Sequence, residues 1–172
     1  MTTMTLNPTS QAISDDRSLV LFRRMAWITI IAVYVLILVG ASVRASGSGM
    51  GCPDWPTCFG QWIPPTSEAQ LPANYQEIYA ARGYAETRFN VVKTWTEDMN
   101  RLLGVSIVFM IFATALFSWR TRAHDPAIAK ASIAAFLIVV FQGGLGSKVV
   151  GSNLMPGLIT VHMLVALAIV GV

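Results

Sequence analysis

Residues 25–43, MAWITIIAVYVLILVGASV, carry no charged side chain and are bounded by Arg24 and Arg44. A helix needs about 20 apolar residues to cross roughly 30 Å of hydrocarbon. The stretch is therefore long enough to span a membrane once. It is also longer than the apolar core of a typical signal peptide, so we expect it to remain in the mature protein.

Three further uncharged stretches follow, at residues 102–119, 131–147 and 149–172. Pro156 suits the start of the last helix, because proline is favoured at the first helical position. The sequence therefore predicts an all-α integral membrane bundle of four helices. The expected organisation is an N-terminal tail at 1–24, helices at 25–43, 95–119, 131–147 and 156–172, and a long loop at 44–94.

Composition supports a membrane protein. Of the 172 residues, 54% are hydrophobic and 12% are charged, whereas soluble domains have about 25% charged residues. The net charge of +3 is spread over the loops and forms no stripe. We therefore expect membrane lipid as a partner and no nucleic acid.

Basic residues close to the ends of membrane helices indicate the cytoplasmic side. The 12 Lys and Arg residues divide evenly between the two sides of the predicted bundle. One group crowds the helix ends, whereas the other is spread along residues 44–94 among acids, which favours a cytoplasmic N-terminus. The first group is Arg17, Arg23, Arg24, Arg120, Arg122 and Lys130, and the second is Arg44, Arg82, Arg88, Lys93, Arg101 and Lys148.

Both cysteines of the chain, Cys52 and Cys58, fall in the loop that this orientation places outside. An oxidising compartment favours a disulfide between them. A zinc site would need two more ligands. Two roles for the pair stay open, because it could hold the loop in shape or pass electrons by thiol-disulfide exchange. Later in the same loop, residues 75–82 predict a short amphipathic helix.

Glu97 has two interpretations. Thr94 and Glu97 have the spacing of a capping box, in which Glu97 would bond the backbone amide of Thr94. Alternatively, Glu97 shares a polar helix face with Asn100 and Arg101. Arg101 then either extends to the membrane interface or neutralises an acidic ligand such as a heme propionate. Two further cations are expected at the same level, Arg44 and Lys148.

His162 is the one histidine within a predicted membrane helix. It follows the helix start by about six residues, or roughly 9 Å. Ionisable residues at such depth usually face a functional interior, and a neutral imidazole there can bind heme iron. The other interpretation is a packed histidine that bonds a neighbouring helix. The preceding helix ends in the glycine-rich run 142–146, which would let another helix or a flat ligand approach its backbone.

Three segments resemble the heme A synthase family: residues 40–60, GASVRASGSGMGCPDWPTCFG; residues 95–104, WTEDMNRLLG; and residues 142–146, QGGLG, followed by 158–162, LITVH. The resemblance covers nearly everything after residue 25. It implies eight membrane helices in two similar four-helix halves, of which this chain is the first. Because the last helix ends in mid-run at Val172, we expect a truncated chain.

The family resemblance implies an activity. Members oxidise the C8 methyl of heme O to a formyl group, giving heme A for terminal oxidases, with oxygen taken from water. The half seen here would hold the substrate heme, and the missing half would hold heme b. The implied location is the bacterial inner membrane, and the implied partners are the heme O synthase that supplies the substrate and, in an oligomer, other copies of the chain.

Roles carry over by matching positions. Glu97 matches the family's essential acid, His162 an axial histidine of the heme iron, and Cys52 with Cys58 the outer-loop cysteine pair. Asn100 departs from the family, which commonly has histidine there. That departure favours a rival interpretation, a non-catalytic heme-binding or oxidase-assembly protein. A thiol oxidoreductase that reduces quinone is a further rival, but it usually needs two cysteine pairs.

Overall fold

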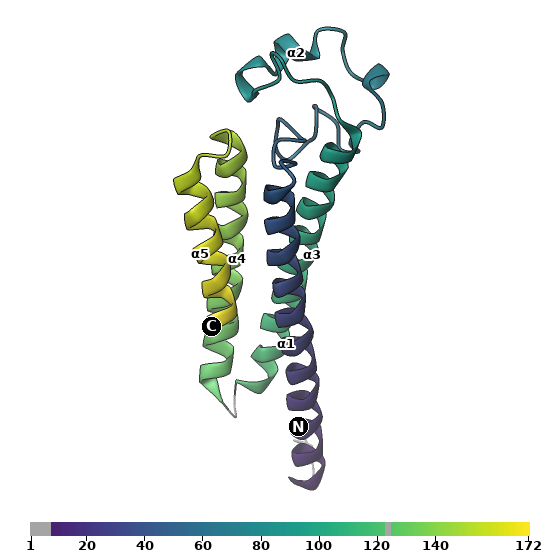
Figure 1. Ribbon diagram of the computed structural model, residues 1–172. Coiled ribbons are helices and arrows are strands. Elements are labelled where there is room, and N and C mark those ends of the chain that lie inside the picture. Colours follow the sequence, from purple (N-terminus) through teal and green to yellow (C-terminus); the bar gives the residue numbers. More distant parts are fainter. Residues whose placement is uncertain (1–7, 123–124) are drawn as a thin grey trace, which may run out of the picture.

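The computed structural model describes residues 8–122 and 125–172. Its long helices are α1 (Pro8–Ala45), α3 (Val91–Thr121), α4 (Pro126–Gly151) and α5 (Pro156–Gly171). Between α1 and α3 lie the short helix α2 (Tyr75–Ile78) and the 3-10 turns η1 (Glu68–Gln70) and η2 (Ala80–Arg82). No strand occurs in the described ranges. The predicted all-α membrane bundle is therefore confirmed (Figure 1).

Three helices, α1, α3 and α4, are long and apolar enough to cross a membrane. Helix α5 is equally apolar but has 16 residues, which corresponds to about 24 Å at 1.5 Å per residue. The four helices lie side by side, and the segment between α1 and α3 covers one end of the bundle (Figure 1). We call this segment, residues 46–90, the outer loop, after the side of the membrane that the sequence predicts for it.

The helices start where side chains can satisfy their first amides. Asn90 caps α3 by accepting a bond from the backbone N–H of Lys93 at 3.1 Å, and Asp125 caps α4 in the same way through Ala127. The capping box expected at Thr94 and Glu97 is wrong, because α3 has already begun at Val91. Helix α5 starts at Pro156, as predicted.

Two elements are longer than expected. Helix α1 begins at Pro8, inside the segment 1–24 that the sequence assigned to an N-terminal tail; residues 1–7 of that tail lie outside the described residues. Helix α4 extends from Pro126 to Gly151 and so exceeds 131–147 at both ends. Apolar stretches define only the part of a helix inside the hydrocarbon, so the polar ends escaped the prediction.

The bundle closes in a ring. Helix α1 packs on α3, α3 on α4, α4 on α5 and α5 back on α1. Helices α3 and α5 therefore stand at opposite corners. An apolar cluster fills the middle of the bundle: Val33, Ile107, Ile111, Val139 and Ile169.

The outer loop has a core of its own. The ring of Phe59 makes edge-to-face contacts with Tyr75, Tyr79, Tyr84 and Phe89, at centroid distances of 5.2 to 6.3 Å. Such aromatic pairs favour a fixed geometry beyond simple area burial. The expected short helix at residues 75–82 appears here as α2 followed by η2. The outer loop is thus a folded cap with its own buried core and not merely a linker between two helices.

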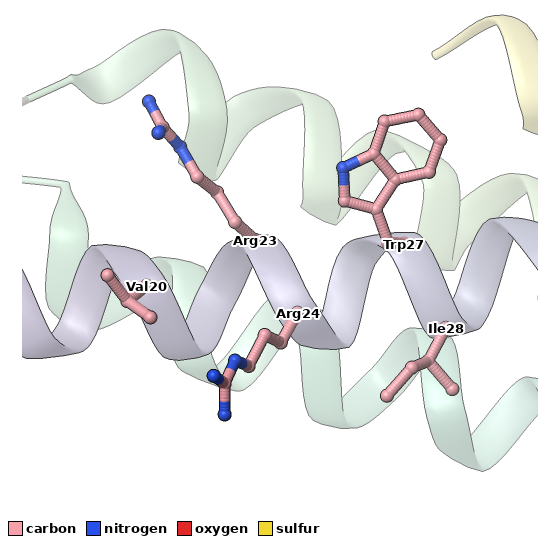
Figure 2. Close-up of a pocket in the computed structure, with 5 residues that line it drawn as sticks. All are labelled: Val20, Arg23, Arg24, Trp27 and Ile28. Atoms are coloured by element: carbon pink, nitrogen blue, oxygen red, sulfur yellow. The ribbon is translucent and has the colours of Figure 1, made fainter.

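Two hollows lie away from this cap. A cavity of about 300 Å³ is lined by residues of all four long helices, including Thr29, Thr114, Ser132 and Ile169. A shallower hollow runs along α1, beside Arg23, Arg24 and Trp27 (Figure 2). Neither is lined by Glu97, Asn100 or His162.

Candidate functional site

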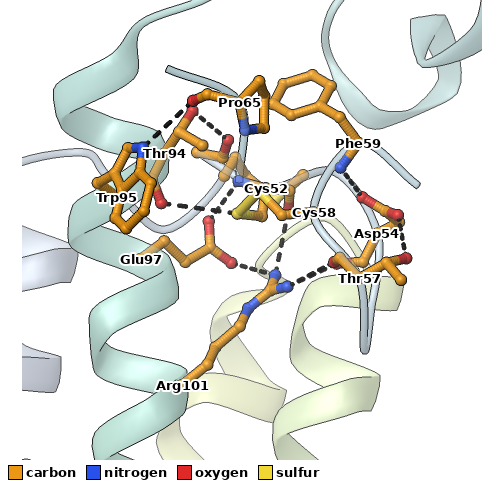
Figure 3. Close-up of a disulfide and its surroundings, with 12 residues drawn as sticks. Cys52, Asp54, Thr57, Cys58, Phe59, Pro65, Thr94, Trp95, Glu97 and Arg101 are labelled. Carbon is orange, nitrogen blue, oxygen red and sulfur yellow. Dashed lines mark hydrogen bonds and ion pairs between the residues drawn. A yellow bond between two sulfur atoms is a disulfide. The ribbon is translucent and has the colours of Figure 1, made fainter. Parts of the chain in front are cut away.

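A disulfide joins Cys52 and Cys58, with their Cα atoms 4.8 Å apart (Figure 3). The two residues are 0% and 1% exposed and belong to the same buried cluster as Phe59, Tyr75 and Tyr84. The expected disulfide is therefore present. Because both sulfur atoms are enclosed, an external thiol could reach them only after the outer loop opened.

Asp54 organises the ring of residues that the disulfide closes. Its carboxylate accepts bonds from the backbone N–H groups of Phe59 at 2.6 Å and Gly60 at 2.7 Å, and from the hydroxyl of Thr57. Phe59 and Gly60 both have positive φ, 54° and 73°, which is typical of a tight type I′ turn. The carboxylate thus holds a backbone conformation that Phe59 would otherwise disfavour.

Arg101 of α3 reaches into that ring (Figure 3). Its guanidinium donates to the backbone carbonyls of Asp54 at 2.7 Å, Thr57 at 3.0 Å and Cys52 at 3.2 Å. It also forms an ion pair with Glu97, one turn earlier on the same helix. A planar group with several fixed donors suits such a set of acceptors. The predicted polar face of α3 therefore binds the backbone of the outer loop through Arg101.

Both carboxylate oxygens of Glu97 have partners. Oε1 bonds Arg101, and Oε2 accepts a bond from the backbone N–H of Cys52 at 2.8 Å. The residue is 4% exposed. Two neighbours in the first turns of α3 strengthen the same junction, because Thr94 donates to the carbonyl of Gly51 and Trp95 to that of Pro65. The chemical role of Glu97 stays a prediction.

His162 lies on α5 against the glycine-rich end of α4. A Cβ atom at Gly146 would stand 3.4 Å from Cε1 of the imidazole, so α5 lies directly against α4 here and leaves room for little more than a methyl group. Gln142 donates from Nε2 to the backbone carbonyl of His162 at 2.7 Å. Within the described ranges, Nδ1 of His162 is buried without a hydrogen-bond partner.

Two other buried polar atoms share this property among the described residues, Oδ1 of Asn100 and Oε1 of Gln142. Asn100 faces α1, where a Cβ atom at Gly40 would lie 3.7 Å from Oδ1. The three side chains come from α3, α4 and α5. Buried polar atoms in native proteins usually have partners. Of these three residues, Gln142 and His162 are in direct contact, so their junction is a candidate place for a ligand.

Arg44 and Lys148 are exposed in the last turns of α1 and α4. They lie at the outer end of the bundle, as expected, but outside the cluster of Glu97 and Arg101. Sequence reasoning missed two residues that matter here, Asp54 and Gln142. Two signals in the sequence could have indicated them: Asp54 is an acid between two cysteines, and Gln142 is a polar residue within an apolar helix.

A heme places modest demands on a protein. The porphyrin supplies four iron ligands, so one or two side chains complete the coordination. The described residues contain no group of three or more His, Cys, Asp or Glu placed to hold a bare metal ion. The half-buried imidazole of His162 suits an axial ligand, because its Nδ1 is unpartnered among the described residues. The carboxamide of Asn100 is a poor ligand for heme iron.

Comparison with known proteins places this fold in a family. The sequence profile of the COX15-CtaA family, described as cytochrome oxidase assembly protein, matches residues 23–172. This chain belongs to the COX15-CtaA family. The resemblance to heme A synthases seen in the sequence motifs is thereby confirmed. No solved structure matches the chain.

COX15-CtaA relatives named "Heme A synthase" match most of the chain. The protein from Shewanella oneidensis is 29% identical over 137 residues, which cover 80% of this chain and 39% of that protein. The one from Methylobacterium is 28% identical over 172 residues, covering 94% and 47%. The one from Alkalihalophilus pseudofirmus is 29% identical over 136 residues, covering 78% and 38%. The chain thus spans less than half the length of these relatives.

Proposed function

We propose that this chain is the substrate-heme half of a heme A synthase, an enzyme that oxidises the C8 methyl of heme O to a formyl group. The observation that carries the proposal is the family match over residues 23–172. The half-buried His162, whose Nδ1 atom is enclosed without a partner among the described residues, agrees with it. The second half, holding heme b, belongs to the same proposal.

In this proposal His162 binds the iron of the substrate heme, and Glu97 takes up a proton as water adds to the oxidised methyl carbon. The conversion of methyl and water to formyl releases four protons and four electrons. A carboxylate near the methyl edge can accept protons if it lies within hydrogen-bond reach of the attacking water. The cofactor of the second half would accept these electrons.

The cations take separate roles. Arg44 and Lys148 remain candidates for the heme propionates, because both are exposed at the outer end of the bundle. The guanidinium of Arg101 is committed to three carbonyls and to Glu97, so we assign it to the protein framework instead. Asn100 would offer the heme a polar contact rather than an iron ligand, because its Oδ1 is buried without a partner among the described residues.

The proposed location is a bacterial inner membrane, with the N-terminus in the cytoplasm and the outer loop outside. The distribution of Lys and Arg supports this orientation. The proposed partners are membrane lipid, a heme O synthase that delivers the substrate and, in an oligomer, further copies of the chain.

A second candidate function is a non-catalytic heme-binding or oxidase-assembly protein. Two observations favour it. Asn100 stands where the family commonly has histidine, and both carboxylate oxygens of Glu97 already hold the outer loop. In that case Glu97 is structural, and the bound heme is passed on unchanged.

Heme extraction separates the two functions. The full-length gene, which in this proposal includes the second half, is expressed in a host that makes heme O but no heme A, and the hemes of its membranes are separated by chromatography. Heme A in those membranes supports the enzyme, whereas bound heme O without heme A supports the assembly protein. Glu97→Gln should abolish the conversion and leave heme bound. Glu77→Gln, an exposed acid of α2, is the matched control.

The ligand assignment has its own test in the absorption spectrum of the bound heme. His162→Ala should change that spectrum, whereas Thr160→Ala, an exposed site on the same helix, should not. An unchanged spectrum in His162→Ala would show that the imidazole does not bind the iron. Asn100→His should shift the spectrum toward the low-spin form of a heme with two histidine ligands.

A further inference from the structure

Two arginines tie the outer loop and the helices together, at different ends of the cap. Arg101 reaches from α3 into the disulfide ring. Arg82 reaches from η2 to the end of α4, where its guanidinium donates to the carbonyl of Gly151 at 2.6 Å and lies 3.5 Å from that of Val150. Both are partly buried. Only Arg101 also contacts an acid, Glu97.

The disulfide ring contacts that acid both directly and through Arg101. Within the ring, Cys52 donates its backbone N–H to Oε2 of Glu97 and offers its carbonyl to Arg101. The carbonyls of Asp54 and Thr57 hold the other side of the same guanidinium. Two groups bond the Glu97 carboxylate, the Cys52 amide and the Arg101 guanidinium, and both thus belong to or are held by the seven-residue segment 52–58.

We propose that Arg101 and the Cys52–Cys58 ring act together as the positioning device for the Glu97 carboxylate. The disulfide contributes by geometry, because it sets the places of the carbonyls that hold Arg101. Arg101 is a positioning residue and does not touch the substrate. The catalytic consequence rests on the proposed function, but the positioning itself does not require heme.

Lysine cannot replace Arg101 in this arrangement. An ammonium group has three donors around one nitrogen, whereas a guanidinium presents five N–H donors in a fixed plane. Arg101 reaches one carboxylate oxygen and three carbonyls that lie around it. Arg101→Lys keeps the positive charge and removes this geometry, so it separates positioning from simple charge neutralisation.

The test reads the Glu97 carboxylate directly, by infrared spectroscopy of the purified chain in detergent micelles without heme. The band that disappears in Glu97→Gln is assigned to Glu97. We expect Arg101→Lys to shift this band and the double variant Cys52→Ala/Cys58→Ala to shift it as well. Arg82→Gln, which loosens the other end of the cap, should leave it in place.

Two outcomes would overturn the proposal. One is an unchanged Glu97 band in Arg101→Lys. The other is an equal shift in Arg82→Gln, which would show that any loosening of the outer loop has the same effect. Should membranes lack heme A while the band still depends on Arg101, the enzymatic function fails and the positioning stands.

Hydrogen exchange provides a second measurement if the Arg101 variant does not fold. Glu97→Gln keeps the shape of the side chain but weakens its bond to the amide of Cys52. We expect the Cys52 amide to exchange about tenfold faster in Glu97→Gln, the size expected for weakening a charged hydrogen bond. Equal exchange rates in the two proteins would contradict a bond between this amide and Glu97.

Discussion

The two parts of the candidate site are built on opposite principles. Around Glu97 and Arg101, the carboxylate and guanidinium bond each other and the backbone of a disulfide ring. Around His162, its own Nδ1 and Oε1 of Gln142 are buried without a partner in the described chain. A satisfied network rigidifies its surroundings, whereas unsatisfied groups are costly unless something binds them. The first part is therefore the framework and the second is the receptive part.

The largest expected effect comes from breaking the framework at Arg101. Arg101→Gln leaves Glu97 buried beside the loop without its cation, and removing one partner of a buried ion pair typically costs about 3–5 kcal/mol. We expect a loss toward the lower end of this range, because Arg101 is 13% exposed. Thermal unfolding in detergent, followed by circular dichroism, measures it. A loss below about 1 kcal/mol would mean that the network does not stabilise the fold.

Removing the disulfide should have the next largest effect. Closing a loop as short as the segment 52–58 restricts the unfolded chain by about 2 kcal/mol. We expect Cys52→Ala/Cys58→Ala to lose about that much stability and to expose the outer loop to limited proteolysis before the helices. Simultaneous cleavage of loop and bundle would contradict a separately folded cap.

Tyr84 should make the cap sensitive to alkali. Burial raises the pKa of its hydroxyl above the ordinary value of 10.0, and the hydroxyl donates to the carbonyls of Met50 and Gly51. The folded state therefore holds this proton where the unfolded state releases it. Its contribution is present below about pH 10 and declines as the pH rises further.

Unfolding measured between pH 8 and about 11 should show this decline, and Tyr84→Phe should reduce its slope. At neutral pH the same variant should lose only about 1 kcal/mol, the usual net value of a hydrogen bond. An identical slope in the variant would assign the alkaline effect to another group.

The smallest effect is expected in the receptive part. Gln142→Leu removes a bond to the carbonyl of His162 and at the same time removes an unpartnered buried oxygen. The two changes oppose each other, so the stability of the chain without heme should change by less than about 1 kcal/mol. A loss as large as that of Arg101→Gln would erase the contrast between the two parts.

Much of the fold could be read from the sequence. Uncharged stretches located the four helices, and the i, i+4 spacing of Glu97 and Arg101 indicated a shared face, which the ion pair confirms. The start of α3 was misplaced because Thr94 and Glu97 satisfy the spacing of a capping box equally well. Asn90 was the competing signal, and it lies before the residues that the hydropathy pattern covers.

The partners of the site residues were beyond reach of the sequence for a physical reason. Arg101 and Gln142 bond backbone carbonyls. Because every residue has such a carbonyl, the residue types in the sequence do not indicate which one will be bonded. The disulfide was predictable because it joins two side chains of a rare kind. The glycine-rich run predicted close approach, but only Gly146 has a neighbour, since a Cβ at Gly143 or Gly144 would meet nothing within 4 Å.

The hydrogen bonds between η2 and the end of α4 connect the cap to a second part of the bundle. Arg82 holds carbonyls at the end of α4, and Asn153, in the turn after α4, donates to the carbonyl of Ala81 at 2.8 Å. The cap therefore adds a second connection to the end of α4, besides the direct packing of α3 on α4. Carbonyls at a helix end have no amide of their own helix left to bond, so Arg82 gives the carbonyl of Gly151 a donor that α4 itself lacks.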